Sequence, residues 1–299
     1  MSEVMVDVGG HTLRLTNLDK VLFPATGTTK GEVLNYYAQI SAVLLPHLAD
    51  RAVTRIRWPN GTDQPSFFEK NAPKGAPSWL RTASVPTSGS RGGSGDQIDF
   101  PIVESLADLT YLANLASLEL HVHQWRVDEA GQPVNPDRLV IDLDPGEGAG
   151  LGECAQVALQ VRDVLADDGL SCAPVTSGSK GLHLYARLDG SRTPDEVRDW
   201  AHEIANGLAR REPLVISQMT KAKRDGKVFF DWSQNTGAKT TISPYSLRGR
   251  NRPMAAAPRT WAEVEAGAED PLELEHLDYT QVLARAAEHG DLFEQGLSG

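Results

Sequence analysis

The sequence contains few cysteines and no long apolar run. Cys154 and Cys172 are the only cysteines among 299 residues, and neither belongs to a Cys-x-x-Cys pair, which argues against a disulfide framework or a cysteine zinc site. No apolar run approaches the roughly 20 residues that cross a membrane. Residues 1–12 also lack the basic-then-apolar pattern of a signal peptide. We therefore expect a cytoplasmic protein with no membrane partner.

Positive net charge is also lacking, since the formal net charge is -11. The acidity is concentrated in residues 261–299, where ten Asp or Glu accompany a single basic residue. By contrast, residues 221–252 carry eight Lys or Arg against two Asp, and residues 51–81 carry six against two acidic residues. Local potential attracts phosphates whatever the net charge, so a nucleic-acid partner is not excluded.

Helix and strand signals alternate irregularly along the chain, without the steady β-α-β order of a doubly wound sheet. Capping-box spacings predict helices starting near Thr29, Ser105 and Thr193, ending at about residues 48, 119 and 211. Period-two patterns predict strands at 52–58, 120–127, 172–176 and 182–188. We therefore expect an α+β fold with two β-sheet lobes facing a cleft and flanking helices.

We expect residues 1–255 to form one two-lobed catalytic domain and residues 256–299 a helical extension packed on it. Residues 253–258 have the composition of a linker, and the Gly/Ser-rich run 87–96 that of a mobile surface loop. The acidic extension has an apolar face that includes Trp261, Val264, Leu272 and Leu274, so we expect it to add stability rather than DNA affinity.

The run at 140–145, V-I-D-L-D-P, is the one around which the candidate site is built. Alternation predicts a strand with Asp142 and Asp144 on one face, about 7 Å apart. Like charges this close repel each other, and a divalent cation with a preference for oxygen ligands relieves the repulsion. A solvated strand end closed by Pro145 and a turn is the alternative interpretation.

A glycine- and serine-rich loop at 177–181 precedes the strand that carries His183 and Tyr185. Such loops expose backbone N–H groups that bind phosphates, and Lys180 adds a positive charge. The Walker A spacing is absent. A glycine-rich hairpin with a surface lysine is the alternative.

A third aspartate, Asp231, ends the apolar run at 227–231. A third carboxylate suits a site for two metal ions, although an Asp followed by polar residues often caps a turn instead. The later run 244–250 contains Arg248 and Arg250, which are suited to bidentate phosphate contact or simply form a solvated basic loop.

These runs together resemble one family. D-L-D-P at 142–145, S-G-S-K-G-L-H-L-Y at 177–185, F-F-D-W-S-Q-N at 229–235 and S-P-Y-S-L-R-G-R at 243–250 are similar to the polymerase domain of bacterial DNA ligase D. That domain is a primase-polymerase of the archaeo-eukaryotic primase superfamily. The resemblance extends in the family's order from residues 15–30 to residues 256–263, and therefore covers most of the chain.

The resemblance implies a nucleotidyltransferase with two divalent metal ions, manganese or magnesium, held by Asp142, Asp144 and Asp231 as catalytic residues. It implies nucleotide binding by His121, Ser177, Lys180, His183, Gln234 and Arg248. His121 would border the sugar of the nucleotide, in a family that tends to prefer ribonucleotides.

The resemblance also implies contacts with DNA. Lys20 and Lys30, supported by Asn17, would bind the 5′-phosphate at a gap or break. Phe67 and Phe68 would stack on template bases, a contact that is energetically favourable for any base. Arg57 and Arg224 would make other DNA contacts.

The sequence departs from the family pattern in three respects. Ile56 replaces a lysine that the family commonly has, the loop at 87–96 looks longer than usual, and no Lys-x-Asp-Gly ligase motif occurs. The chain would therefore be a stand-alone polymerase or one domain of a larger ligase. The expected partners are gapped or broken DNA, nucleoside triphosphates, a DNA ligase and an end-binding protein, with the chain itself monomeric.

The expected function is template-directed gap filling and end extension in DNA break repair. One alternative is a metal-dependent phosphohydrolase in which His121 and His123 are metal ligands, which would favour zinc or iron. The other is a non-catalytic module that binds 5′-phosphorylated DNA ends.

Overall fold

The computed structural model describes residues 3–86 and 97–298, so the predicted loop at 87–96 lies outside the described residues. The chain forms two compact units. Unit 1 comprises Met1–Val134, Thr240–Ala255 and Asp278–Gly290, and unit 2 comprises Asn135–Lys239, Ala256–Leu277 and Asp291–Gly299. Within the described part of the chain, no helix is both long and apolar enough to cross a membrane.

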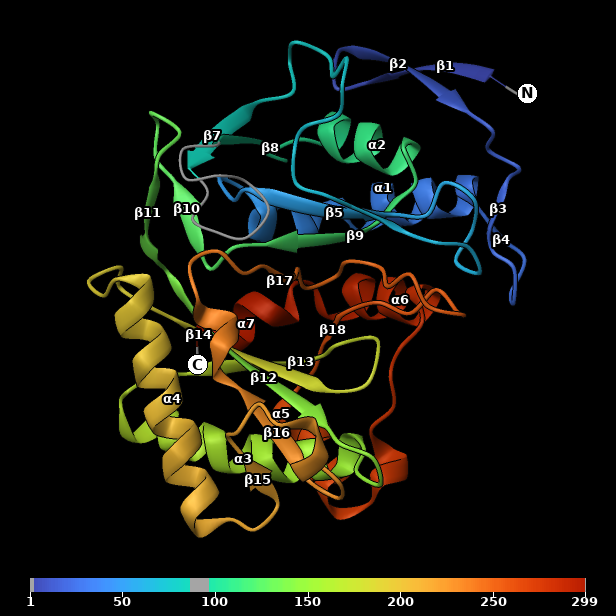
Figure 1. Cartoon of the computed structure of the whole chain (residues 1–299). Helices are drawn as coiled ribbons and strands as arrows, with labels where there is room; N and C mark the ends of the chain where they lie inside the picture. Colours follow the sequence, from blue (N-terminus) through green and yellow to red (C-terminus); the bar gives the residue numbers. More distant parts are fainter. Residues whose placement is uncertain (1–2, 87–96, 299) are drawn as a thin grey trace. The chain divides into compact units, whose positions relative to one another are not determined.

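Unit 1 is built on a four-stranded antiparallel sheet with the strand order β17-β9-β5-β6 (Figure 1). Four strand pairs, β1–β2, β3–β4, β7–β8 and β10 with β11 (Pro133–Pro136), lie outside it. The strands of this unit are β1 (Glu3–Val8), β2 (His11–Thr16), β3 (Val21–Phe23), β4 (Thr28–Thr29), β5 (Val53–Arg57), β6 (Phe67–Glu69), β7 (Thr82–Pro86), β8 (Gln97–Pro101), β9 (Ser117–Val122), β10 (Trp125–Val127) and β17 (Thr241–Ile242). Its helices are α1 (Lys30–Leu48), α2 (Leu106–Asn114) and α6 (Tyr279–His289).

The capping signals in unit 1 give the expected helix starts. Thr29 and Glu32 form a reciprocal capping box at α1, and Ser105 and Asp108 form one at α2. The predicted end of the second helix was wrong, because α2 stops at Asn114. Ala116 has φ 59°, a left-handed conformation that breaks the helix. The residues that follow become β9, a central strand of the sheet.

Unit 2 is built on a six-stranded sheet with the order β15-β16-β12-β14-β13-β18, antiparallel except for β15 and β16. β11 (Pro133–Pro136) crosses the boundary between the two units. The other elements are β12 (Arg138–Pro145), α3 (Leu151–Asp167), β13 (Cys172–Thr176), β14 (Leu182–Arg187), α4 (Pro194–Arg211), β15 (Val215–Ile216), η1 (Lys221–Lys223), β16 (Val228–Asp231), η2 (Trp232–Asn235), β18 (Ala257–Pro258), α5 (Trp261–Glu269), η3 (Pro271–Glu273) and α7 (Leu292–Ser298).

The two faces of this sheet differ. Leu139, Ile141 and Leu143 of β12 point into a core shared with α3, α4 and α5. Alternation therefore turns Asp142 and Asp144 to the opposite face. In Figure 1, α3 and α4 lie on one side of β12 and β14, and α7 lies on the other. Phe293 of α7 packs against Tyr185 of β14.

The C-terminal segment is divided between the two units. α6 belongs to unit 1, whereas α5 and α7 belong to unit 2. Two expectations for this region were wrong: Ala257–Pro258 is a strand paired with β13 and not a linker, and Leu272 is 80% exposed. Leu274, not Leu272, is buried, because Gly267 leaves room for its side chain: a Cβ there would lie 2.3 Å from Leu274 Cβ.

Candidate functional site

Asp142 lies in the centre of a polar row across three strands of unit 2. Its cross-strand partners are Asp231 on β16 and His183 on β14. His183 Nε2 is 3.3 Å from Asp142 Oδ1. Although Asp142 and His183 are far from Asp231 in sequence, strand pairing brings all three together.

Asp144 lies two residues after Asp142 on the same face of β12, and we call Asp142, Asp144 and Asp231 the acidic row. The pKa of Asp144 is raised to about 6, mainly by burial and also by the negative charges of Asp142 and Asp231, while His183 and Arg224 oppose the shift. Ionisation of all three carboxylates at once is therefore unfavourable, because the negative charges on one face repel each other. A bound cation would remove this penalty.

Asp231 uses its two oxygens differently. Oδ1 accepts hydrogen bonds from the N–H and hydroxyl of Ser233 and so caps η2. Oδ2 accepts a hydrogen bond from Gln234 Nε2, which also donates to Asp142 Oδ2. Lys239 donates to Ser233 Oγ and lies 3.9 Å from Asp231 Oδ2. Asp231 therefore caps η2 through Oδ1, as the alternative interpretation expected, whereas its role as a metal ligand stays a prediction.

The loop before β14 is held by one serine. Ser177 Oγ accepts hydrogen bonds from the backbone N–H groups of Ser179, Lys180 and Gly181, at 3.3, 3.3 and 3.2 Å. The loop packs closely on β12, because a Cβ at Gly181 would lie 2.0 Å from Leu143 O. Lys180 is exposed at the tip. The loop is therefore a tight turn next to the acidic row, with its lysine in solvent.

Two of the predicted nucleotide-binding residues, His121 and Arg248, lie in unit 1 and meet at Glu119. Glu119 Oε2 is 2.8 Å from His121 Nε2 and 3.2 Å from Arg248 Nη1, and Oε1 accepts a hydrogen bond from Gly249 N at 2.9 Å. Burial alone would raise the pKa of Glu119, but the contacts with His121, Arg248 and Gly249 lower it overall. Sequence reasoning missed Glu119, because it assigned this residue to a helix end.

The segment that carries Arg248 is not a solvated basic loop. Residues 241–247 are buried, and Ser246 Oγ accepts a hydrogen bond from Leu120 N. Tyr36 Oη donates to Tyr245 O at 2.6 Å. Trp58 packs on Gly249 so closely that a Cβ there would lie 2.3 Å from the indole ring. Arg248 is thus presented from a rigid segment.

The proposed 5′-phosphate residues of unit 1 are neighbours. Lys30 N donates to Lys20 O, and Lys20 N donates to Asn17 O. The Lys30 ammonium is buried and donates to Thr16 O at 2.6 Å. Burial, together with a smaller effect of the nearby Lys20 charge, lowers the pKa of Lys30 to about 8. Asn17 has φ 54°, the left-handed conformation that Asn tolerates, and so shapes this turn.

Phe67 and Phe68 on β6 are 51% and 60% exposed, so neither belongs to the core. Arg57 donates to Glu69 at 2.6 Å and to Leu115 O at 2.7 Å, and is partly committed to the fold. In unit 2, Arg224 lies 3.6 Å over the Phe229 ring and donates to Met219 O. The proposed DNA roles of all four residues stay predictions.

Comparisons with known proteins show the family of the chain. The family described as LigD, primase-polymerase domain, matches residues 29–293. The chain belongs to the LigD primase-polymerase family. The multifunctional non-homologous end joining protein LigD of Mycobacterium bovis is 53% identical over 287 residues, covering 94% of this chain and 36% of that protein. The bifunctional non-homologous end joining protein LigD of Bacillus subtilis is 33% identical over 256 residues, covering 85% and 40%.

A solved structure adds the fold. The polymerase domain of Mycobacterium tuberculosis ligase D in complex with DNA matches with a TM-score of 0.88 and 49% identity, covering 96% of this chain and 98% of that one. The predicted α+β fold of archaeo-eukaryotic primase type is confirmed. LigD primase-polymerases are DNA-directed nucleotidyltransferases. The chain spans about a third of the length of the Mycobacterium LigD proteins it matches.

LigD primase-polymerases depend on metal ions, and the acidic row of this member offers the right donor type. Carboxylate oxygens are the ligands that magnesium and manganese prefer. In the part of the chain that the structure describes, no three His, Cys, Asp or Glu side chains converge into a complete metal site. Asp142 and Asp231 are instead joined through the Gln234 amide.

The His-x-His pair does not form a metal site in this LigD member. β9 ends at Val122, and His123 is buried, stacked on Trp125 with ring centroids 4.2 Å apart. Its Nδ1 is 3.2 Å from Ala52 O, and burial lowers its pKa to about 4. His121 faces Glu119. The observations therefore give no support to a histidine-ligated hydrolase.

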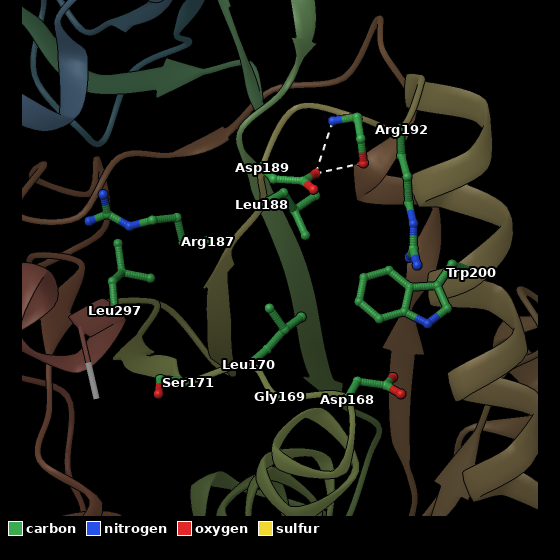
Figure 2. Close-up of a pocket in the computed structure, with 11 residues that line it drawn as sticks. Asp168, Gly169, Leu170, Ser171, Arg187, Leu188, Asp189, Arg192, Trp200 and Leu297 are labelled. Carbon is green, nitrogen blue, oxygen red and sulfur yellow. Dashed lines mark hydrogen bonds between the residues drawn. The ribbon is translucent and has the colours of Figure 1, made fainter.

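A pocket of 590 Å³ in unit 2 is separate from the acidic row (Figure 2). It lies at the other end of β14, where Arg187 and Leu188 follow His183 and Tyr185. Figure 2 shows Arg192 next to Trp200, and the guanidinium carbon lies 4.3 Å from the ring centroid. Asp189 accepts hydrogen bonds from Ser191. None of the predicted site residues lines this pocket.

Proposed function

We propose that the chain catalyses template-directed nucleotidyl transfer that fills gaps and extends ends in DNA break repair, with a preference for ribonucleotides. The observation that carries the proposal is the direct pairing of Asp142 with Asp231, with Asp144 one strand repeat further on the same face, in a member of the LigD family. Members from Mycobacterium and Bacillus are named as non-homologous end joining proteins.

The three aspartates would hold two divalent ions, manganese or magnesium. When bound, such ions lower the pKa of an attacking hydroxyl and neutralise charge on phosphates. Gln234 would orient Asp142 and Asp231 toward the ions and also contact the incoming nucleotide. Lys239 and Ser233 would fix the orientation of the Asp231 carboxylate. The in-line attack of a 3′-hydroxyl on the α-phosphate would then occur over this row.

Separate sets of residues would bind the substrates. The loop held by Ser177, with Lys180 and His183, would contact the triphosphate, and Arg248 would contact phosphate. His121 would border the sugar. The solved Mycobacterium tuberculosis domain was in complex with DNA, which supports DNA binding by Lys20, Lys30 and the exposed Phe67 and Phe68. A DNA ligase and an end-binding protein are the expected partners.

The test is extension of a primer across a short gapped duplex that carries a 5′-phosphate. Manganese, magnesium or zinc is supplied in turn, with ribonucleoside or deoxyribonucleoside triphosphates. The expected result is templated addition with manganese or magnesium and faster use of ribonucleotides. Binding of the gap without any addition would instead favour a non-catalytic end-binding module. Zinc-dependent release of phosphate would favour a hydrolase.

A further inference from the structure

Glu119 is a buried carboxylate in the middle of β9, with three partners. It is 4% exposed, and His121, Arg248 and the backbone of Gly249 all contact it. Glu119 and His121 are two residues apart on one strand and share a face, whereas Arg248 comes from a segment more than a hundred residues later. One carboxylate therefore contacts two residues, His121 and Arg248, that are proposed to bind the nucleotide and that lie far apart in the sequence.

The contact with Glu119 determines which nitrogen of His121 carries hydrogen. An ionised carboxylate only accepts hydrogen bonds, and the pKa of Glu119 is held low by its partners. His121 Nε2 must therefore be the protonated nitrogen that donates at 2.8 Å. In the neutral ring, Nδ1 is then left without hydrogen and acts as an acceptor. A sugar hydroxyl can donate to such a nitrogen, whereas a deoxy carbon cannot.

We propose that Glu119 is the positioning residue that sets the tautomer of His121 and the direction of Arg248, and through His121 favours a nucleotide with a 2′-hydroxyl. The inference rests on the proposed function of His121 and Arg248. The effect on His121 discriminates between sugars. The effect on Arg248 concerns phosphate, which both nucleotide classes share, and so changes their binding equally.

The tautomer is measured on the unaltered full chain without any turnover. Nitrogen-15 spectra of labelled protein above pH 8, compared with those of His121→Gln, identify the ring signals of His121. The expected pattern is a protonated Nε2 and an unprotonated Nδ1. An Nδ1-protonated ring would overturn the inference and would leave the proposed polymerase function untouched. This measurement also does not depend on whether a Glu119 variant folds.

The variant Glu119→Gln keeps the size of the side chain but lets its amide donate or accept. In this variant the KM for ribonucleotides is expected to rise about 3- to 10-fold more than the KM for deoxynucleotides, which corresponds to the loss of roughly one hydrogen bond. The ring of His121 is expected to show a mixture of its two tautomers. Glu104→Gln, which loses a surface ion pair with Arg81, is the control and should leave both KM values unchanged. An equal rise for both nucleotide classes, with the His121 spectrum unaltered, would show that Glu119 serves only Arg248 or the fold.

Discussion

Asp142 on β12 and Asp231 on β16 are direct cross-strand partners, and Gln234 Nε2 donates to one oxygen of each, at 3.3 and 3.2 Å. Like charges directly opposite on neighbouring strands are unfavourable. The amide N–H groups of Gln234 offset part of this repulsion. Strand pairing and the shared amide together hold the two carboxylates close to each other, which is the property a cation site requires.

Replacing Asp142 or Asp231 with asparagine should lower nucleotide addition at least about 100-fold, because each change removes an anionic ligand. The melting temperature should stay the same or rise slightly, since like charge is removed. Asp167→Asn, an exposed site at the end of α3, is the control and should retain full activity. Normal nucleotide addition by either the Asp142 or the Asp231 variant would exclude these aspartates as metal ligands.

Asp144 should make the stability of unit 2 depend on pH. Its pKa is raised to about 6 in the folded chain, whereas an unfolded Asp titrates near about 4. Between these values the folded state binds more protons, so the free energy of unfolding falls as pH rises from about 4 to about 6 and is level above. Asp144→Asn should remove this fall in melting experiments across pH.

Manganese provides an independent check on Asp144. At pH 7 the parent chain should melt at a higher temperature when manganese is added, because the ion relieves the repulsion between carboxylates. The gain should shrink in Asp144→Asn. An equal gain in both chains would place the bound manganese elsewhere.

The double change Lys20→Ala and Lys30→Ala should weaken binding to 5′-phosphorylated gapped DNA about 10- to 100-fold, the worth of charge-assisted hydrogen bonds. Binding to hydroxyl-ended gaps should hardly change. Since the pKa of Lys30 is about 8, its positive charge is present below pH 8 and lost above. The phosphate-dependent part of the affinity should therefore fall between pH 7 and 9.

Fluorescence anisotropy with the two kinds of gap measures both effects. Lys74→Ala, at an exposed lysine of the same unit, controls for the loss of a surface positive charge. An equal loss on phosphorylated and hydroxyl-ended gaps would identify Lys20 and Lys30 as general backbone contacts.

Phe67→Ala and Phe68→Ala should each reduce affinity for a single-stranded template by about 5- to 100-fold, because stacking contributes roughly 1–3 kcal/mol per base. The melting temperature should change little, since both rings are mainly exposed. Met5→Ala, at a residue that is 62% exposed in the same unit, controls for the loss of surface apolar area. Unaltered template affinity in both phenylalanine variants would rule out the stacking role.

Leu274→Ala should cost about 2–5 kcal/mol in the free energy of unfolding, as buried leucines do, and leave affinity for gapped DNA unchanged. Leu272→Ala, two residues earlier, should have almost no effect because Leu272 is 80% exposed. Chemical denaturation and gap-DNA titration of both variants give the comparison. A loss of affinity at full stability in Leu274→Ala would connect the acidic segment to DNA binding.

The sequence by itself determined features that depend on neighbouring residues. The capping boxes at Thr29, Ser105 and Thr193 start helices where expected, because a cap bonds to N–H groups only three residues away. The period of two puts Asp142 and Asp144 on one face for a similarly local reason. Four motifs in a shared order were also sufficient to recognise the family, since motif order needs no coordinates.

Only the tertiary structure decided which distant residues meet. Strand pairing, which no local pattern specifies, sets Asp142 against Asp231 and leaves Gln234 to join them. The helix expected to reach Glu119 ends at Asn114, because the sheet of unit 1 takes the residues that follow as a central strand. Glu119 thereby becomes a buried partner of His121 and Arg248. Leu274 is buried and Leu272 is not, because the absence of a side chain at Gly267 leaves room for Leu274. That contact depends on packing between elements.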